Sequence, residues 1–186
     1  KKHDKIICSK NGFNEALKGL KNCEAVGINI SIKTIILKQN YKELDKFVEF
    51  AFKNFQNPWV SIHGLILRGI AKENYEKIIT RHSEVAPYLE KALDVAEKYK
   101  KNIGLSIIPT CIIDPYYWKF CNVGWKETSE KMVYISPEEQ TFGDMDAEQP
   151  KYCKGCKITN HCSWAWESAW KEYIQLFGTN ELNKIK

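Results

Sequence analysis

The chain has 186 residues, of which 44% are hydrophobic and 27% are charged, and its formal net charge at pH 7 is +5. This composition is typical of one or two folded globular domains and argues against a disordered chain. The lysines are spread along the chain, so no basic stripe predicts nucleic-acid binding, and no apolar run approaches the roughly 20 residues that cross a bilayer.

The first part of the chain alternates between helical and extended patterns. Apolar residues at helical spacing predict a helix over 13–23, and the alternating and then continuous apolar residues of 28–37 predict a buried strand. Asn40 stands three residues before Glu43, which predicts a cap for a second helix over 41–54.

The same alternation continues downstream. A second strand is predicted over 59–67, an amphipathic helix over 84–100, and a third strand over 103–108, which Pro109 closes. Strands and helices in this order predict right-handed crossovers and a parallel sheet, and hence an α/β fold. We therefore expect residues 1–109 to form half of an α/β barrel or sheet, with the opening helix following a further strand upstream.

The character of the chain changes near residue 110. Residues 110–186 are rich in cysteines, aromatic residues and turn formers, and we expect them to form a small Cys-rich domain. A short strand is predicted over 131–135, and a helix over 163–177 closes the chain.

Seven cysteines in a lysine-rich chain without a signal peptide predict a cytoplasmic protein whose cysteines are metal ligands and buried thiols rather than disulfides. An odd number also leaves no complete pairing within the chain. The first residue is lysine and not methionine. We therefore expect the chain to be a piece of a longer protein.

Cys153 and Cys156 form a CxxC motif, and Cys162 follows six residues later. A CxxC turn brings two thiolates to one ion because the backbone reverses between them, and Gly155 eases that reversal. A CxxC with a third cysteine so close by favours a metal site over buried free thiols. Cys8 and Cys23 have no such neighbours, and we expect them to be buried free thiols.

The fourth ligand must come from elsewhere in the chain. Cys111 is the first choice because it lies just past the third predicted strand, where parallel α/β folds present functional groups. Cys121 is the second choice and His161 the third. Three or four thiolates suit either zinc or an iron–sulfur cluster, and their spacing does not separate the two.

Several segments carry a resemblance to a known family. Residues 3–22 look like the segment after the third barrel strand of radical S-adenosylmethionine (SAM) enzymes, and residues 27–44 and 63–71 resemble the segments around the fourth and fifth strands. Residues 108–111, the motif Cys153-x2-Cys156-x5-Cys162, and the Phe177-Gly178 and Glu181-Leu182 pairs resemble an auxiliary-cluster tail of the twitch or SPASM-like kind.

The resemblance implies the C-terminal half of a partial (β/α)6 barrel over 1–109 and an auxiliary-cluster domain over 110–186. In such enzymes a CxxxCxxC motif upstream holds the [4Fe–4S] cluster that cleaves SAM to a 5′-deoxyadenosyl radical. This sequence contains no CxxxCxxC. We therefore expect that the fragment alone does not generate the radical and that the motif lies upstream in the intact parent.

The resemblance further implies that Cys111, Cys153, Cys156 and Cys162 ligate an auxiliary [4Fe–4S] cluster. It implies SAM as a cofactor of the parent, a peptide or protein as the substrate, and an electron donor such as ferredoxin or flavodoxin. The rival interpretation is a zinc-stabilised binding module without catalysis, in which the metal holds the Cys-rich part together. A redox-active CxxC ranks last, because thioredoxin-like motifs lie near the start of a βαβ unit.

The first predicted strand carries three alternating polar residues, Asn29, Ser31 and Lys33. They either face the barrel interior, where they would touch SAM or the substrate, or face solvent. His63, followed by Gly64, either brings the backbone close to the SAM adenine or is structural.

Overall fold

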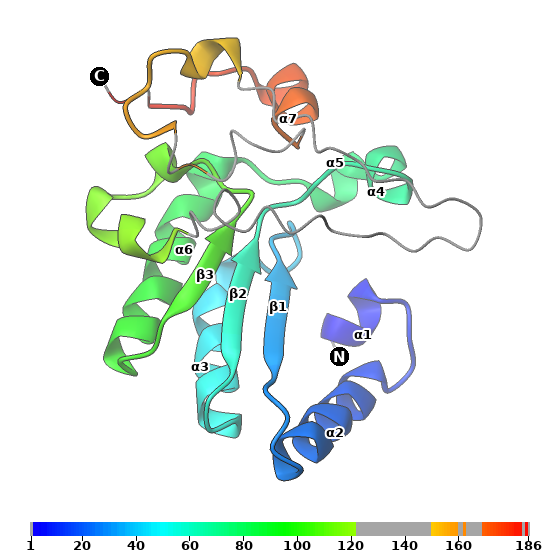
Figure 1. The fold of residues 1–186 in the computed structure, drawn as a ribbon. Coiled ribbons are helices and arrows are strands. Elements are labelled where there is room, and N and C mark those ends of the chain that lie inside the picture. The colour runs from blue at the N-terminus through cyan, green and yellow to red at the C-terminus, as the bar shows by residue number, and fades with distance from the viewer. Residues whose placement is uncertain (1, 122–149, 160–161, 163–168, 184, 186) are drawn as a thin grey trace, which may run out of the picture.

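The computed structural model describes residues 2–121, 150–159, 162, 169–183 and 185. Its described strands form a parallel sheet in the order β1-β2-β3, which are Ser31–Ile35, Trp59–His63 and Ile103–Ser106 (Figure 1). In the register, Ser31 pairs with Trp59, and Val60 of the central strand pairs with Ile103. All three strands therefore end at the same edge of the sheet.

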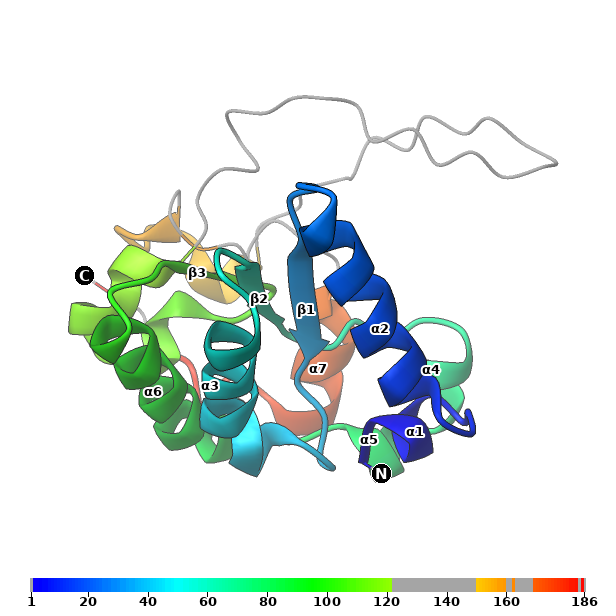
Figure 2. The ribbon, with the colours of Figure 1, turned by 90° about the horizontal axis from the view of Figure 1, so that it is seen from below.

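Two helices connect these strands and cover one face of the sheet. Helix α3, Leu44–Asn54, follows β1, and helix α6, His82–Lys98, follows β2 (Figure 2). Their apolar stripes meet Val60 and Ile62 of β2, which are fully buried. Burying one large aliphatic side chain contributes about 1.5–3 kcal/mol, so this layer holds the main core. The residues from α3 and α6 in it are Leu44, Val48, Ala51, Phe52, Val85, Leu89, Ala92, Leu93 and Ala96.

The other described elements lie around this two-layer unit. The remaining α-helices are α1 (Lys2–Ile6), α2 (Gly12–Ala25), α4 (Ile70–Glu73), α5 (Tyr75–Ile78) and α7 (Ala169–Phe177). Short 3-10 helices are Tyr41–Glu43, Thr110–Ile112, Pro115–Phe120 and Lys151–Cys153. Helix α2 is tied to the chain before it, because the Phe13 N–H donates to Asp4 Oδ1 at 2.7 Å.

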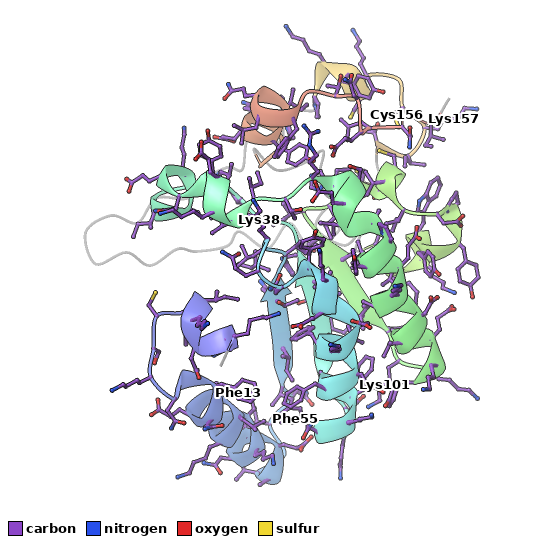
Figure 3. All side chains as sticks on the ribbon, turned by 180° about the vertical axis from the view of Figure 1, so that it is seen from behind. Phe13, Lys38, Phe55, Lys101, Cys156 and Lys157 are labelled. Atoms are coloured by element: carbon purple, nitrogen blue, oxygen red, sulfur yellow. The ribbon has the colours of Figure 1, made fainter. Side chains whose placement is uncertain are left out.

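The Cys-rich part lies beyond the carboxyl ends of the strands. Figure 1 shows α7 at this end of the molecule. Figure 3 shows Cys156 and Lys157 at the same end, and Phe13 and Phe55 at the opposite one. A second, smaller apolar cluster forms here, made of Ile107, Cys162, Tyr173 and Leu182. The tail thus packs onto the loops that follow the strands.

The α/β fold with a parallel sheet is confirmed, and the structure corrects the ends of its elements. The strands predicted over 59–67 and 103–108 stop at His63 and Ser106. The helix predicted over 84–100 begins two residues earlier, at His82, and ends at Lys98. The strand predicted over 131–135 and the first part of the helix predicted over 163–177 lie outside the described residues.

Two local expectations about the first strand and the turn after it are wrong. The strand predicted as buried over 28–37 is shorter, and within it Ser31, Lys33 and Ile35 are exposed because β1 ends the row of described strands. The Asn40 side chain caps no helix. It accepts from the Leu37 N–H at 2.8 Å and donates to the Ile35 carbonyl at 2.9 Å, so it stabilises the turn after β1.

None of the described helices has the length and apolar character needed to cross a membrane.

Candidate metal centre

The path of the chain after β3 brings Cys111 to the carboxyl edge of the sheet. Ile107 has φ 59°, a left-handed conformation that is an outlier for a β-branched residue and costs about 1–3 kcal/mol. Its side chain is only 9% exposed and packs in the small cluster with Cys162 and Tyr173. This packing holds the strained turn, which leads through Pro109 into the 3-10 turn that contains Cys111.

The strained turn also explains the glycine that follows the neighbouring strand. Gly64 follows β2, and its N–H donates to the Ser106 carbonyl at 2.9 Å. A Cβ atom at Gly64 would lie 1.9 Å from the carbonyl oxygen of Ile107. Only glycine therefore allows the segment after β2 and the segment after β3 to pass this close to each other.

The CxxC motif forms the predicted reversal. Gly155 has φ 74°, and the Cys156 N–H donates to the Cys153 carbonyl at 2.9 Å. The Thr159 hydroxyl then donates to the Cys156 carbonyl at 2.8 Å, and the Cys162 N–H donates to the Thr159 carbonyl at 3.2 Å. These bonds keep the loop from Cys153 to Cys162 compact.

The four cysteines predicted as ligands line the same pocket. Cys111 comes from the edge of the sheet, whereas Cys153, Cys156 and Cys162 come from the tail. The cavity itself is small, with a volume of about 20 Å³. All four cysteines are free thiols, with Cys162 buried and the other three half-buried. The remaining lining residues are Pro109, Tyr152, Ile158, Thr159, Leu182 and Asn183.

The four sulfurs share this pocket without forming a ready coordination shell. Within the described ranges, no three His, Cys, Asp or Glu side chains are spaced so that they hold one metal ion. Converging on one centre would therefore require the cysteine side chains to change rotamer or the loops to tighten.

The surroundings of Cys111 favour its neutral thiol in the absence of a cation. Burial raises the pKa of Cys111 to about 11, the backbone of Asn183 lowers this pKa in part, and the nearby Cys162 and Cys156 raise it. The Thr110 N–H donates to Cys162 Sγ at 3.4 Å. A bound cation reverses this balance, because metal ligands are thiolates. An all-sulfur donor set suits zinc and iron–sulfur clusters.

Of the two alternative fourth ligands, the structure describes only Cys121. Cys121 does not line the pocket and lies beside β3, where it forms a β-bridge with Leu105. Burial raises its pKa to about 11, the Thr110 side chain lowers it by a hydrogen bond, and Cys162 raises it. Cys121 is therefore a neighbour of the pocket. His161 lies outside the described residues.

The residues predicted to touch SAM are only partly brought together. In the register, Lys33 pairs with Ser61, and His63 pairs with both Ile35 and Ser106. Because residues that pair, and residues two apart on one strand, share a face, Ser31, Lys33 and His63 lie on one face of the sheet. Asn29 is exposed and precedes β1. Burial and the charge of Lys33 lower the pKa of His63 to about 4, so its ring is neutral at pH 7.

The sequence reasoning missed the C-terminal wall of the pocket. Leu182 and Asn183 line it, and the Tyr152 hydroxyl donates to the Leu182 carbonyl at 2.7 Å. These contacts use backbone groups, which any residue type supplies, so no pattern of residue types in the sequence predicts them.

Comparison of the chain with family models, with curated proteins and with solved structures gave no match in any of the three.

Proposed function

We propose that Cys111, Cys153, Cys156 and Cys162 bind an auxiliary [4Fe–4S] cluster and that the chain is the C-terminal part of a radical SAM enzyme. The observation that carries the metal site is that these four thiols line one pocket, although Cys111 lies 42 positions before Cys153 in the sequence. Four cysteine thiolates are the usual ligands of a [4Fe–4S] cluster.

The surroundings of the four sulfurs support a cluster. Pro109, Ile158 and Leu182 give the pocket an apolar wall, which limits the access of water. The backbone N–H of Thr110 donates to the sulfur of Cys162 at 3.4 Å. Solvent exclusion and N–H···S hydrogen bonds are two means by which proteins set the reduction potential of a cluster. When bound, such a cluster accepts or relays an electron.

The α/β layer supports the second half of the proposal. Three parallel strands joined by α3 and α6 fit the C-terminal half of a partial (β/α)6 barrel. The face of the sheet that carries Ser31, Lys33 and His63 would line its interior and contact SAM. Because the chain has no CxxxCxxC, radical formation requires a segment that this sequence lacks. The parent would then modify a peptide or protein and take electrons from a ferredoxin or flavodoxin.

Anaerobic reconstitution with iron and sulfide tests the metal site. We expect a brown protein with broad visible charge-transfer absorption and equal amounts of iron and acid-labile sulfide. Cys111→Ser and Cys156→Ser should lose most of this iron, whereas Cys8→Ser should keep it, because Cys8 is exposed and does not line the pocket.

Two outcomes would contradict the proposal. Colourless protein that retains stoichiometric zinc after anaerobic purification would support the zinc-stabilised module instead. Full iron content in Cys111→Ser, together with its loss in Cys121→Ser, would move the fourth ligand from the pocket to the neighbouring thiol.

A further inference from the structure

Residues 182 and 185, near the end of the described part of the chain, form hydrogen bonds on both sides of the CxxC motif. The Leu182 carbonyl accepts from the Tyr152 hydroxyl at 2.7 Å, one residue before Cys153. The Ile185 carbonyl accepts from the Lys157 N–H at 3.0 Å, one residue after Cys156. Between them, Leu182 and Asn183 line the pocket together with Cys111. The position of these residues therefore sets the position of one wall of the pocket.

The chain just before Leu182 is anchored at the first turn of α6. One carboxylate oxygen of Glu181 accepts from the Arg81 guanidinium at 2.8 Å, and the other accepts from the Tyr173 hydroxyl at 2.6 Å. That second oxygen also accepts from the Ser83 N–H at 3.4 Å, and the Tyr173 hydroxyl accepts from the His82 N–H at 2.8 Å. The Glu181 side chain is only 8% exposed, so these bonds are poorly screened by solvent.

These contacts amount to a helix cap supplied from about 100 positions away in the chain. The first N–H groups of an α-helix have no partner within the helix, and His82 and Ser83 are the first two residues of α6. Tyr173 and Glu181 accept from these groups, and the negative charge of Glu181 suits the positive end of the helix dipole. The His82 ring also stacks on Tyr173 with centroids 3.9 Å apart. Helix α6 is packed in the main core, so the cap is rigid.

We propose that Glu181 is a positioning residue for the metal centre: by capping α6 together with Arg81, it fixes the Leu182–Asn183 wall that lines the pocket beside Cys111. This inference depends on the proposed metal site. Loss of the Glu181 charge would free the wall and expose Cys111. Outer partners of metal ligands typically contribute 10–100-fold in metal affinity.

Glu181→Gln tests the proposal, and Glu97→Gln is its matched control. Glu97 lies in the last turn of the same helix and accepts from Lys119 and the Tyr116 hydroxyl, but no residue of that group lines the pocket. Titration with Co²⁺ against a competing chelator measures thiolate coordination directly. We expect Glu181→Gln to bind Co²⁺ about 10–100-fold more weakly, and Glu97→Gln to bind within about twofold of the unmodified chain.

A second measurement does not depend on metal. The alkylation rate of Cys111 in metal-free protein, followed by peptide mass spectrometry, should rise in Glu181→Gln and stay constant in Glu97→Gln. Tyr173→Phe removes one hydroxyl but keeps the ring stack, and it should give a smaller rise. The alkylation rate of Cys111 can still be measured for a variant that folds too poorly for the Co²⁺ titration.

The outcomes separate the two proposals. If the unmodified chain binds no Co²⁺ and no iron, the metal site itself is refuted, and faster alkylation in Glu181→Gln would show only that the cap shields Cys111. If the chain binds metal and folded Glu181→Gln retains its Co²⁺ affinity or its slow Cys111 alkylation, the positioning role is refuted. A uniform rise at all seven cysteines would also refute it, because it would indicate general unfolding.

Discussion

Gly64→Ala is the sharpest test of how the end of the sheet builds the pocket. The added Cβ atom would lie 1.9 Å from the Ile107 carbonyl oxygen and 2.9 Å from its carbonyl carbon, both of them backbone atoms. The backbone segments at Gly64 and Ile107 must then separate by about 1 Å or more before this contact becomes tolerable. Ile107 already has a strained φ of 59°, so it has little freedom to move away.

The cost follows from two terms. Overpacking typically costs about 1–3 kcal/mol, and weakening the bond from the Gly64 N–H to the Ser106 carbonyl adds about 1 kcal/mol. We expect the free energy of unfolding to fall by about 2–4 kcal/mol. With a urea m-value of about 2 kcal/mol/M, the midpoint moves down by about 1–2 M. Because Ile107 leads to Cys111, we also expect weaker Co²⁺ binding.

Gly19→Ala is the matched control for this substitution. Gly19 lies within α2, and a Cβ atom there would meet no atom within 4 Å. Replacing an unstrained helical glycine by alanine should raise the free energy of unfolding by about 0.5–1 kcal/mol. If urea unfolding shows both variants within about 0.5 kcal/mol of the unmodified chain, the steric argument for Gly64 is refuted.

Two further predictions concern the core and the pH dependence. Leu89 is fully buried, so Leu89→Ala should lower the free energy of unfolding by about 2–5 kcal/mol, whereas Leu176→Ala, at a side chain 37% exposed, should cost less than about 1 kcal/mol; equal urea midpoints would contradict this. Burial lowers the pKa of His82 to about 4, and nearby Glu181 only partly opposes the shift. The unfolded chain therefore takes up the proton first, and stability should fall by about 2 kcal/mol as the pH drops from 7 to 5. His82→Phe, which keeps an aromatic ring against Tyr173, should flatten this slope in unfolding curves; an unchanged slope would exclude His82 as its source.

The crossover helices were well predicted because their apolar spacing directly reports the face that is buried. Val85, Leu89, Ala92 and Ala96 recur at helical spacing, and all four are buried in α6. The strand ends were predicted less well. Leu67 and Ile108 are buried but lie outside the strands, so their apolar character reports burial rather than pairing in the sheet.

The first strand shows the same difficulty with an apolar residue that is exposed. Ile35 and Ile36 are adjacent and identical, yet Ile35 is 45% exposed and Ile36 is 6% exposed. A run of apolar residues does not reveal whether a strand lies at the centre or the edge of a sheet, because that depends on which strands pair with it. Asn40 illustrates the local equivalent. Its side chain was predicted to cap a helix, but it forms hydrogen bonds with the backbone of Ile35 and Leu37. These local bonds use the side-chain groups that a helix cap would need.

By itself, the sequence determined the parts of this protein that depend on short-range spacing. These are the α/β alternation, the amphipathic helices and the compact CxxC loop with its third cysteine. Only the tertiary structure decided that Cys111 lies at the same pocket as that loop, and that Glu181 caps a helix that begins about 100 positions earlier. The physical reason is that local spacing fixes turn and helix geometry, whereas the meeting of distant segments depends on how the whole core packs beneath the carboxyl ends of the strands.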